Sequence, residues 1–273
     1  MAYILHDFSP FLWQWSEQWG IRYYGLAYVL GFLATWQGLR IFRRRGWSHL
    51  EIGQESDLLT WLVLGVLIGG RLGYVLFYES WELTLQDPLS IIAFWREGGI
   101  SGMASHGGFI GVILALVLFS YVHKISFWPL ADNIAVFTPL GLGLGRIANF
   151  INGELWGRPT DLPWAFLFPQ DPTGLPRHPS QLYEAFLEGF LIFAIMLMLR
   201  KRIQRPGRIG LIFLCLYAVA RIFCEFFREP DPQIGYIFGI FTQGQLLSFG
   251  LILIALILWP FLPQSTLSKT KLR

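Results

Sequence analysis

The stretch "GRIANFINGELWG" (residues 145–157) ends a long apolar run with one arginine, two asparagines and a glutamate. An arginine near the centre of a bilayer costs about 3 kcal/mol on insertion scales, so it needs water, a polar partner or an anionic ligand. The stretch therefore raises two questions. One is whether the run before it crosses a membrane, and the other is what its polar side chains bind.

The composition of the whole chain answers the first question. Of its 273 residues, 54% are hydrophobic and 14% are charged, and the mean hydropathy is +0.48. A transmembrane helix needs about 20 apolar residues, and seven stretches approach that length. They lie at about 23–42, 58–78, 107–122, 130–150, 182–199, 209–227 and 244–262. We therefore predict an all-α polytopic membrane protein with about seven transmembrane helices, forming a single integral membrane domain over residues 1–273.

The basic residues predict the orientation, because Lys and Arg near the ends of spans are retained on the cytoplasmic side. Of the 21 Lys and Arg, thirteen follow the first, third, fifth and last spans: Arg40, Arg43, Arg44, Arg45, Lys124, Arg200, Lys201, Arg202, Arg205, Arg208, Lys269, Lys271 and Arg273. We expect the N-terminus outside and the C-terminus inside. The predicted outer segments are about 1–22, 79–106, 151–181 and 228–243, and the cytoplasmic segments are about 43–57, 123–129, 200–208 and 263–273.

Two outer stretches interleave aromatic and polar residues, "SPFLWQWSEQW" (9–19) and "DPLSIIAFWREGG" (87–99). Such a pattern suits a short helix lying in the headgroup layer. An ordinary aromatic belt at the membrane interface is the alternative for both stretches.

Other patterns limit the possible functions. Gly65, Gly69 and Gly73 recur at four-residue spacing, which favours close helix packing. The two cysteines, Cys215 and Cys224, are too far apart along one helix to form a disulfide. The five histidines show no paired metal-ligand spacing, so we expect no metal site. No internal repeat is visible, which weighs modestly against an inverted-repeat transporter.

Two of the three arginines inside predicted spans are Arg71 and Arg221. Arg71 is expected either to pair with a carboxylate or a helix-end carbonyl, or to serve a function. Tyr217, Arg221, Glu225 and Arg228 recur at i, i+4, i+8 and i+11, so they share one stripe of a helix. A salt bridge from Arg221 to Glu225 is the simplest reading of that stripe.

The third arginine, Arg146, has several polar neighbours in the sequence, and the formation of a turn does not account for all of them. Asn149 follows it by about one helical turn, and Asn152 and Glu154 come where the helix ends. A guanidinium binds phosphate with two parallel hydrogen bonds and stays charged at physiological pH. Arg146 and Arg221 together would therefore suit a phospholipid headgroup near the outer surface.

Two histidines lie at the starts of predicted spans. Gly107 and Gly108 follow His106 and let a ligand or a neighbouring backbone come close, which favours a site at His106. His178 lies between an arginine and a proline, and we expect a structural role for it.

With these residues assembled, the chain resembles the prolipoprotein diacylglyceryl transferases of bacterial inner membranes. The family signature, Gly-Arg-x-x-Asn-Phe-x-Asn-x-Glu-x-x-Gly, occurs unbroken at residues 145–157. The blocks "YYGLAY", "GGRLGYVLFY", "SHGG", "RHPSQLYE" and "YAVARIFCEFFREPD" follow the family's order. The resemblance implies transfer of the diacylglyceryl group of phosphatidylglycerol to the lipobox cysteine of a prolipoprotein, with release of glycerol 1-phosphate.

The resemblance also implies roles for individual residues. The arginines matching Arg146 and Arg221 are regarded as essential in that family. The other implied site residues line or support the site: Tyr24, His106, Asn149, Glu154, Gly157, Tyr217 and Glu225. The attacking thiol must lose its proton, and His106 is our candidate base, with Glu154 left open as the alternative.

The expected partners are phosphatidylglycerol, prolipoprotein signal peptides bearing a lipobox cysteine, and the lipid bilayer, with no cofactor and no nucleic acid. The expected location is the bacterial inner membrane, with several spans and the active site towards the outer, periplasmic face. Two other functions stay open from the residues alone. One is an anion transporter or channel that uses the intramembrane arginines as its filter. The other is a noncatalytic lipid-binding scaffold, which would have no use for a base.

Overall fold

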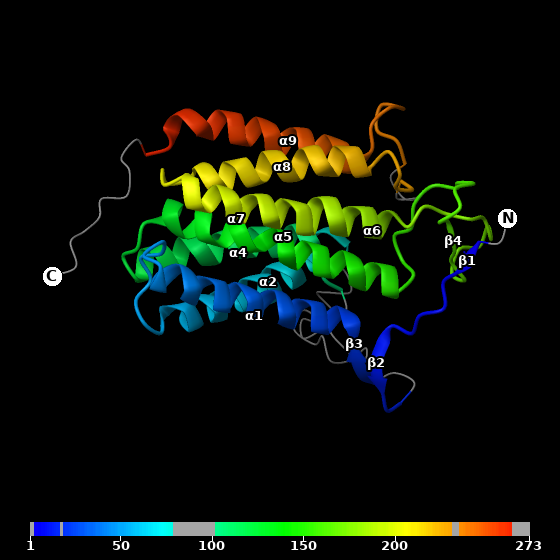
Figure 1. Ribbon diagram of the computed structural model, residues 1–273, viewed down its shortest axis with the longest axis horizontal. Helices are drawn as coiled ribbons and strands as arrows, with labels where there is room; N and C mark the ends of the chain where they lie inside the picture. Colours follow the sequence, from blue (N-terminus) through cyan, green and yellow to red (C-terminus); the bar gives the residue numbers. More distant parts are fainter. Residues whose placement is uncertain (1–2, 17–18, 79–101, 231–234, 264–273) are drawn as a thin grey trace. The chain divides into compact units, whose positions relative to one another are not determined.

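The computed structural model describes residues 3–16, 19–78, 102–230 and 235–263 (Figure 1). The chain divides into two compact units, and each is described by itself. The first unit comprises Met1–Leu12, Ile21–Leu33 and Asp132–Arg273, and the second comprises Trp13–Gly20 and Ala34–Ala131. The prediction of a single domain stays a prediction.

The predicted helical class is confirmed, since each of the seven apolar stretches forms a helix. The helices are α1 (Tyr23–Arg44), α2 (Gln54–Tyr78), α4 (Ser105–Val122), α5 (Phe127–Ile151), α6 (Ser180–Glu184) continued by the π-helix η2 (Ala185–Leu191) and α7 (Ile192–Arg202), α8 (Arg208–Cys224), and α9 (Gln243–Leu258) followed by the short η3 (Trp259–Phe261). Among the described residues, four helices are long and apolar enough to cross a membrane: Gln54–Phe77, Phe127–Ile151, Ser180–Arg202 and Gln243–Phe261. The chain is thus a membrane protein, while seven spans and an outer N-terminus remain predictions.

Short strands lie near the N-terminus. In the first unit, β1 (Ile4–Leu5) runs parallel to β4 (Phe166–Leu167). The helix predicted over residues 9–19 is wrong, because Phe11–Gln14 forms strand β2, which is followed by strand β3 (Gly20–Arg22). Aromatic residues favour extended backbone where cross-strand neighbours are available. The other predicted interfacial helix, at 87–99, lies outside the described residues.

Glycines hold α2 against α4 in the second unit. A Cβ atom on Gly65 would lie 2.7 Å from the carbonyl oxygen of Gly111, and one on Gly69 would lie 2.4 Å from that of Gly107. Neither distance is sterically possible, so the two backbones approach as closely as they do only because these side chains are absent. The predicted close packing at Gly65, Gly69 and Gly73 is confirmed.

Arg71 also belongs to this unit, where it contacts a backbone carbonyl and an aromatic ring. Its Nη1 donates to the carbonyl oxygen of Gly102 at 3.2 Å, and its guanidinium lies 5.4 Å from the ring centroid of Tyr74.

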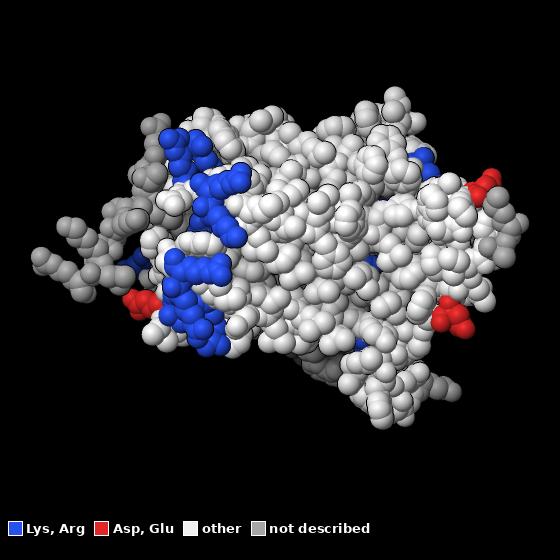
Figure 2. All heavy atoms as spheres, viewed as in Figure 1, with Lys and Arg blue, Asp and Glu red and all other residues white. Residues whose placement is uncertain are grey.

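At one end of the first unit, a carboxylate from α5 caps α8. Asp132 accepts hydrogen bonds from the backbone N–H groups of Gly207 at 2.7 Å and Gly210 at 2.8 Å. The neighbouring Asn133 accepts from Nε of Arg200 at 3.1 Å, which ties α5 to α7. Arg200 begins the basic last turn of α7, and Figure 2 shows Lys and Arg side chains gathered where α7 ends and α8 begins.

Candidate active site

Arg146 lies on α5, close to the helix that carries α6, η2 and α7. The two helices meet at Gly143 and Gly189, where a Cβ on Gly189 would lie 2.4 Å from Cα of Gly143. Arg146 is one turn beyond Gly143, and Glu188 immediately precedes Gly189. The glycine contact therefore brings the acidic residues of α6 and η2 beside the arginine.

Arg146 forms ion pairs with two carboxylates. Its Nε lies 2.8 Å from Oε2 of Glu184, and its Nη2 lies 3.6 Å from Oε2 of Glu188. Both glutamates are fully buried. Without a cation at this distance, two adjacent carboxylates could not both stay ionised in the membrane interior.

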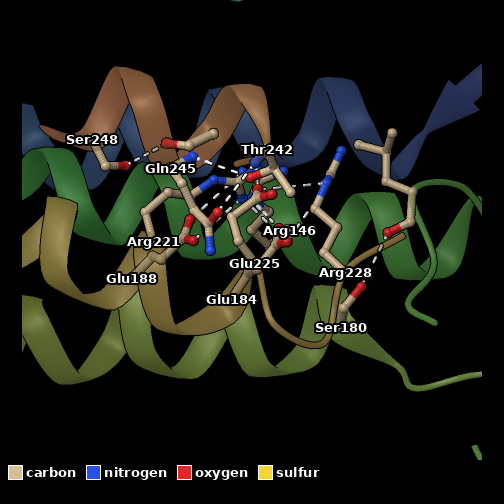
Figure 3. Close-up of polar contacts among 12 residues, drawn as sticks. Arg146, Ser180, Glu184, Glu188, Arg221, Glu225, Arg228, Thr242, Gln245 and Ser248 are labelled. Atoms are coloured by element: carbon tan, nitrogen blue, oxygen red, sulfur yellow. Dashed lines mark hydrogen bonds and ion pairs between the residues drawn. The ribbon is translucent and has the colours of Figure 1, made fainter. Parts of the chain in front are cut away.

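Arg221 on α8 contacts the same two carboxylates from the other side (Figure 3). Its Nη1 lies 3.2 Å from Oε1 of Glu184 and 3.3 Å from Oε1 of Glu188. Its Nη2 pairs with Glu225, so the predicted i, i+4 salt bridge is confirmed. Two arginines far apart in the sequence are thus held at one place by shared counter-ions.

A third arginine completes the group. Nη1 of Arg228 lies 3.3 Å from Oε1 of Glu184, and its Nε lies 4.0 Å from Oε1 of Glu225. We call the set of three arginines and three glutamates the arginine–glutamate cluster. Its members are Arg146, Glu184, Glu188, Arg221, Glu225 and Arg228. Their formal charges cancel.

The first turn of α9 packs against Glu225. A Cβ on Gly244 would lie 2.4 Å from Oε1 of Glu225, so a larger residue there would displace the carboxylate. Thr242 and Gln245 form a capping box that starts α9 at this point. A carboxylate beside a helix N-terminus is stabilised by the exposed N–H groups and the helix dipole.

The asparagines of the signature organise Glu154 and Tyr24. Nδ2 of Asn149 donates to Oε1 of Glu154 at 2.8 Å and to the Tyr24 hydroxyl at 3.3 Å. Nδ2 of Asn152 lies 3.4 Å from the same Glu154 oxygen. In the described parts of the chain, Glu154 is therefore held by amides, and no arginine forms an ion pair with it.

Gly157 lies where three stretches of backbone meet. Its N–H donates to the carbonyl oxygen of His178 at 2.9 Å, and it forms an antiparallel bridge with Arg228. A Cβ there would lie 2.5 Å from the carbonyl oxygen of Phe227. Gly157 thus permits the close backbone contact that places Arg228.

An ion pair orders the segment after β4. Arg177 donates from Nε to Oδ2 of Asp171 at 2.7 Å and from Nη2 to Oδ1 at 3.2 Å, while its Nη1 lies 3.1 Å from Glu229. Burial opposes ionisation of Asp171, but hydrogen bonds from Arg177 and Thr173 outweigh it and lower the pKa of Asp171.

His178 contacts Tyr183 and Gly157, and the structural role expected of it stays a prediction. Its Nδ1 lies 3.2 Å from the hydroxyl oxygen of Tyr183, and its carbonyl accepts from Gly157. Burial lowers the pKa of this histidine, which favours the neutral imidazole.

The predicted site residues separate into groups. Arg146, Arg221 and Glu225 share the cluster, and Tyr217 lies one turn before Arg221 on α8. Tyr24, Asn149 and Glu154 form a second group in the same unit. His106 lies in the first turn of α4, in the other unit, with an exposed side chain, and its role stays a prediction.

The predicted site residues did not include three members of the cluster, Glu184, Glu188 and Arg228, although the helical stripe through Arg221 did include Arg228. A usable signal existed for two of them, because "YEAFLEGF" places carboxylates four residues apart inside an apolar span. Ionisable residues in such a segment mark functional sites by default. The π-helical η2 gives the same indication, since π-helical turns occur frequently at functional sites.

The chain is similar to proteins of one known family. The family model described as prolipoprotein diacylglyceryl transferase matches residues 10–261. The phosphatidylglycerol–prolipoprotein diacylglyceryl transferase of Bradyrhizobium diazoefficiens is 45% identical over 269 residues, covering 94% of this chain and 94% of the relative. Its namesake from Rhodospirillum centenum is 49% identical over 243 residues, covering 86% and 85%. That from Azospirillum brasilense is 46% identical over 237 residues, covering 85% and 87%.

Proposed function

Since the chain belongs to the prolipoprotein diacylglyceryl transferase family, we propose that it transfers the sn-1,2-diacylglyceryl group of phosphatidylglycerol to the lipobox cysteine thiol of prolipoproteins. A thioether forms and glycerol 1-phosphate leaves. The observation that carries the proposal beyond the family is the pair of partly buried arginines, Arg146 and Arg221, joined by shared carboxylates inside an apolar helical unit.

The arginines bind the phosphate of the lipid in this proposal. Arg146 and Arg221 come from different helices, so an anion between them would meet guanidinium groups on two sides. Guanidinium groups hold phosphate oxygens with paired hydrogen bonds. Binding in a membrane interior strengthens these contacts, because little water competes for them.

The chemistry proceeds by substitution at carbon. The thiol loses its proton to a base and its sulfur attacks the glycerol carbon that bears the phosphate ester. The C–O bond breaks, and its electron pair stays on the phosphate oxygen. The departing phosphate monoester carries more negative charge than the diester, so Arg146 and Arg221 stabilise the transition state more than the ground state.

His106 is the proposed base, and Glu154 is the alternative. A histidine is the side chain that most often serves as a general base. Glu154 accepts hydrogen bonds from two asparagines. That arrangement fits a carboxylate that binds the hydroxyl groups of the glycerol headgroup.

The remaining site residues hold the lipid or the arginines. We assign Asn149, Tyr24 and Tyr217 to hydrogen bonds with the lipid headgroup. Glu225 orients Arg221 through the i, i+4 ion pair. Gly157 acts through the backbone contact that positions Arg228.

The proposed location is the bacterial inner membrane, with the site towards the outer face. The end of α7 and the start of α8 are basic, and Arg221 lies thirteen residues beyond Arg208 on α8, about 20 Å along the helix. If the basic end faces the cytoplasm, as positive residues usually do, the cluster opens towards the outer leaflet. The lipid bilayer and a lipobox signal peptide are then the partners.

The test uses purified protein, phosphatidylglycerol and a synthetic lipobox peptide. Mass spectrometry should show a diacylglyceryl adduct on the peptide, with matching release of glycerol 1-phosphate. A peptide with serine in place of the cysteine is the control and should gain no mass. A folded sample that forms no adduct would contradict the proposal, and anion flux through proteoliposomes would then be measured.

A further inference from the structure

Glu188 is a buried carboxylate to which the proposed reaction gives no role. It lies in η2 with no exposed surface. Its Oε1 is 3.3 Å from Nη1 of Arg221, and its Oε2 is 3.6 Å from Nη2 of Arg146. Within the described residues, Oε2 accepts no hydrogen bond, and the same is true of Oε2 of Glu184. Glu188 therefore faces both phosphate-binding arginines while contacting each of them loosely.

The other two glutamates of the cluster are held more tightly. Glu184 lies within 3.3 Å of three arginines, with its shortest contact 2.8 Å from Arg146. Glu225 pairs closely with Arg221 and is packed against the start of α9. Judged by the shortest ion-pair distance of each carboxylate, Glu188 at 3.3 Å is the one held least closely.

The backbone of Glu188 is fixed even though its carboxylate is loosely held. A Cβ on the neighbouring Gly189 would lie 2.4 Å from Cα of Gly143 and 3.3 Å from the carbonyl oxygen of Pro139. Because η2 already touches α5, this glutamate cannot move closer to Arg146 by shifting the helix. Only its side chain can respond to a ligand.

The net charge of the arginine–glutamate cluster changes when a phosphodiester binds. The cluster holds three guanidinium groups and three carboxylates, so it is neutral without substrate. A phosphodiester adds one negative charge and needs donors that the carboxylates now occupy. A buried anion without a donor is strongly unfavourable, so the most weakly bound carboxylate must give up its contacts.

We propose that Glu188 is a positioning residue, the internal counter-ion that holds Arg146 and Arg221 ready in the empty site and yields them to the phosphate of the incoming lipid. The inference rests on the proposed function and identifies how that site is kept neutral between turnovers. As the phosphate monoester leaves, the carboxylate returns to the arginines and assists its release.

Glu188→Gln tests the proposal because it removes the charge and keeps the shape. The variant carries an excess buried positive charge, which is destabilising, and an anionic ligand then offsets it by binding to the folded state. Thermal unfolding is measured in maltoside micelles with phosphatidylglycerol or with diacylglycerol, which lacks the phosphate. We expect phosphatidylglycerol to raise the Tm of the variant by at least about 3 °C more than it raises that of the wild type.

Two matched variants serve as controls. Glu188→Asp keeps the charge and should respond to phosphatidylglycerol as the wild type does. Asp132→Asn removes another buried carboxylate of the same unit, fourteen residues from Arg146 along α5, about 21 Å away. It should lose stability equally in both lipids. An equal response of Glu188→Gln and Asp132→Asn, or failure of Glu188→Gln to fold in either lipid, would overturn the proposal.

Kinetics give a second readout that a purely structural role would not move. With the lipobox peptide, Glu188→Gln should show a lower KM for phosphatidylglycerol together with a lower kcat, because substrate and phosphate product are both held more tightly. Glu188→Asp should restore both values towards the wild type. A higher KM in Glu188→Gln would contradict the inference. An inactive wild type would instead contradict the proposed function, while the Tm comparison would still test Glu188.

Discussion

Two sets of buried carboxylates in the first unit are neutralised in different ways. Asp132, near one end of α5, accepts hydrogen bonds from the backbone of α8. Glu184 and Glu188, facing the other end of α5, are paired with arginine side chains. Backbone donors cannot move away without unwinding a helix, whereas arginine side chains can turn towards a ligand. The first arrangement therefore stabilises the fold, and the second leaves donors that a substrate can use.

The largest effect in this comparison is expected from the arginines. Arg146→Ala and Arg221→Ala each remove a guanidinium group that we propose binds the leaving phosphate. Loss of one such donor typically costs about 10²- to 10³-fold in kcat, so transfer should fall at least that far. The assay is diacylglyceryl transfer at matched protein levels in membranes. Wild-type transfer rates in either variant would contradict the proposed roles of the two arginines.

His106→Asn tests the proposed base. The chemical step should slow by about 10²-fold or more, while binding of phosphatidylglycerol changes little. Single-turnover kinetics measure the chemical step, and lipid-dependent thermal stabilisation measures binding. If binding falls and the chemical step does not, His106 contacts the headgroup and Glu154 becomes the first candidate base.

Asp132→Asn tests the buried carboxylate that is held by backbone N–H groups. It weakens two hydrogen bonds to backbone N–H groups and should lower the free energy of unfolding by about 1–3 kcal/mol. The specific activity of the folded protein should be unchanged, because Asp132 lies far along α5 from the arginines. Thermal unfolding and transfer rates on the same sample check both parts. A large loss of specific activity would mean that the two ends are coupled.

The smallest effect is expected at Asp171, which is paired with Arg177 outside the membrane-spanning segments. Its pKa is lowered in the folded state relative to the usual 3.8. The stability that it contributes is therefore present above that pH and is lost as the pH falls through the lower, folded value. The Tm of the wild type should fall more steeply below pH 3.8 than that of Asp171→Asn. Parallel curves would show that the ion pair adds nothing measurable.

Local pattern was a reliable guide wherever one element decides the outcome. Apolar length predicted each helix, and the four-residue glycine spacing predicted the close packing of α2 on α4. Helical periodicity also predicted the Arg221–Glu225 ion pair, because both residues lie on one helix. The stretch at 9–19 misled because its aromatic pattern suits a helix, whereas strand pairing depends on residues that follow it.

The sequence by itself determined the membrane class and the family signature at residues 145–157, and it singled out Arg146 and Arg221 as candidates, since each follows from local composition or spacing. Only the tertiary structure decided which carboxylates from other helices neutralise those arginines. Glu184 and Glu188 meet Arg146 and Arg221 because α5, η2 and α8 pack together. Such pairings join residues distant in the chain, and the physical reason for them is that charges inside an apolar bundle must find partners across helices.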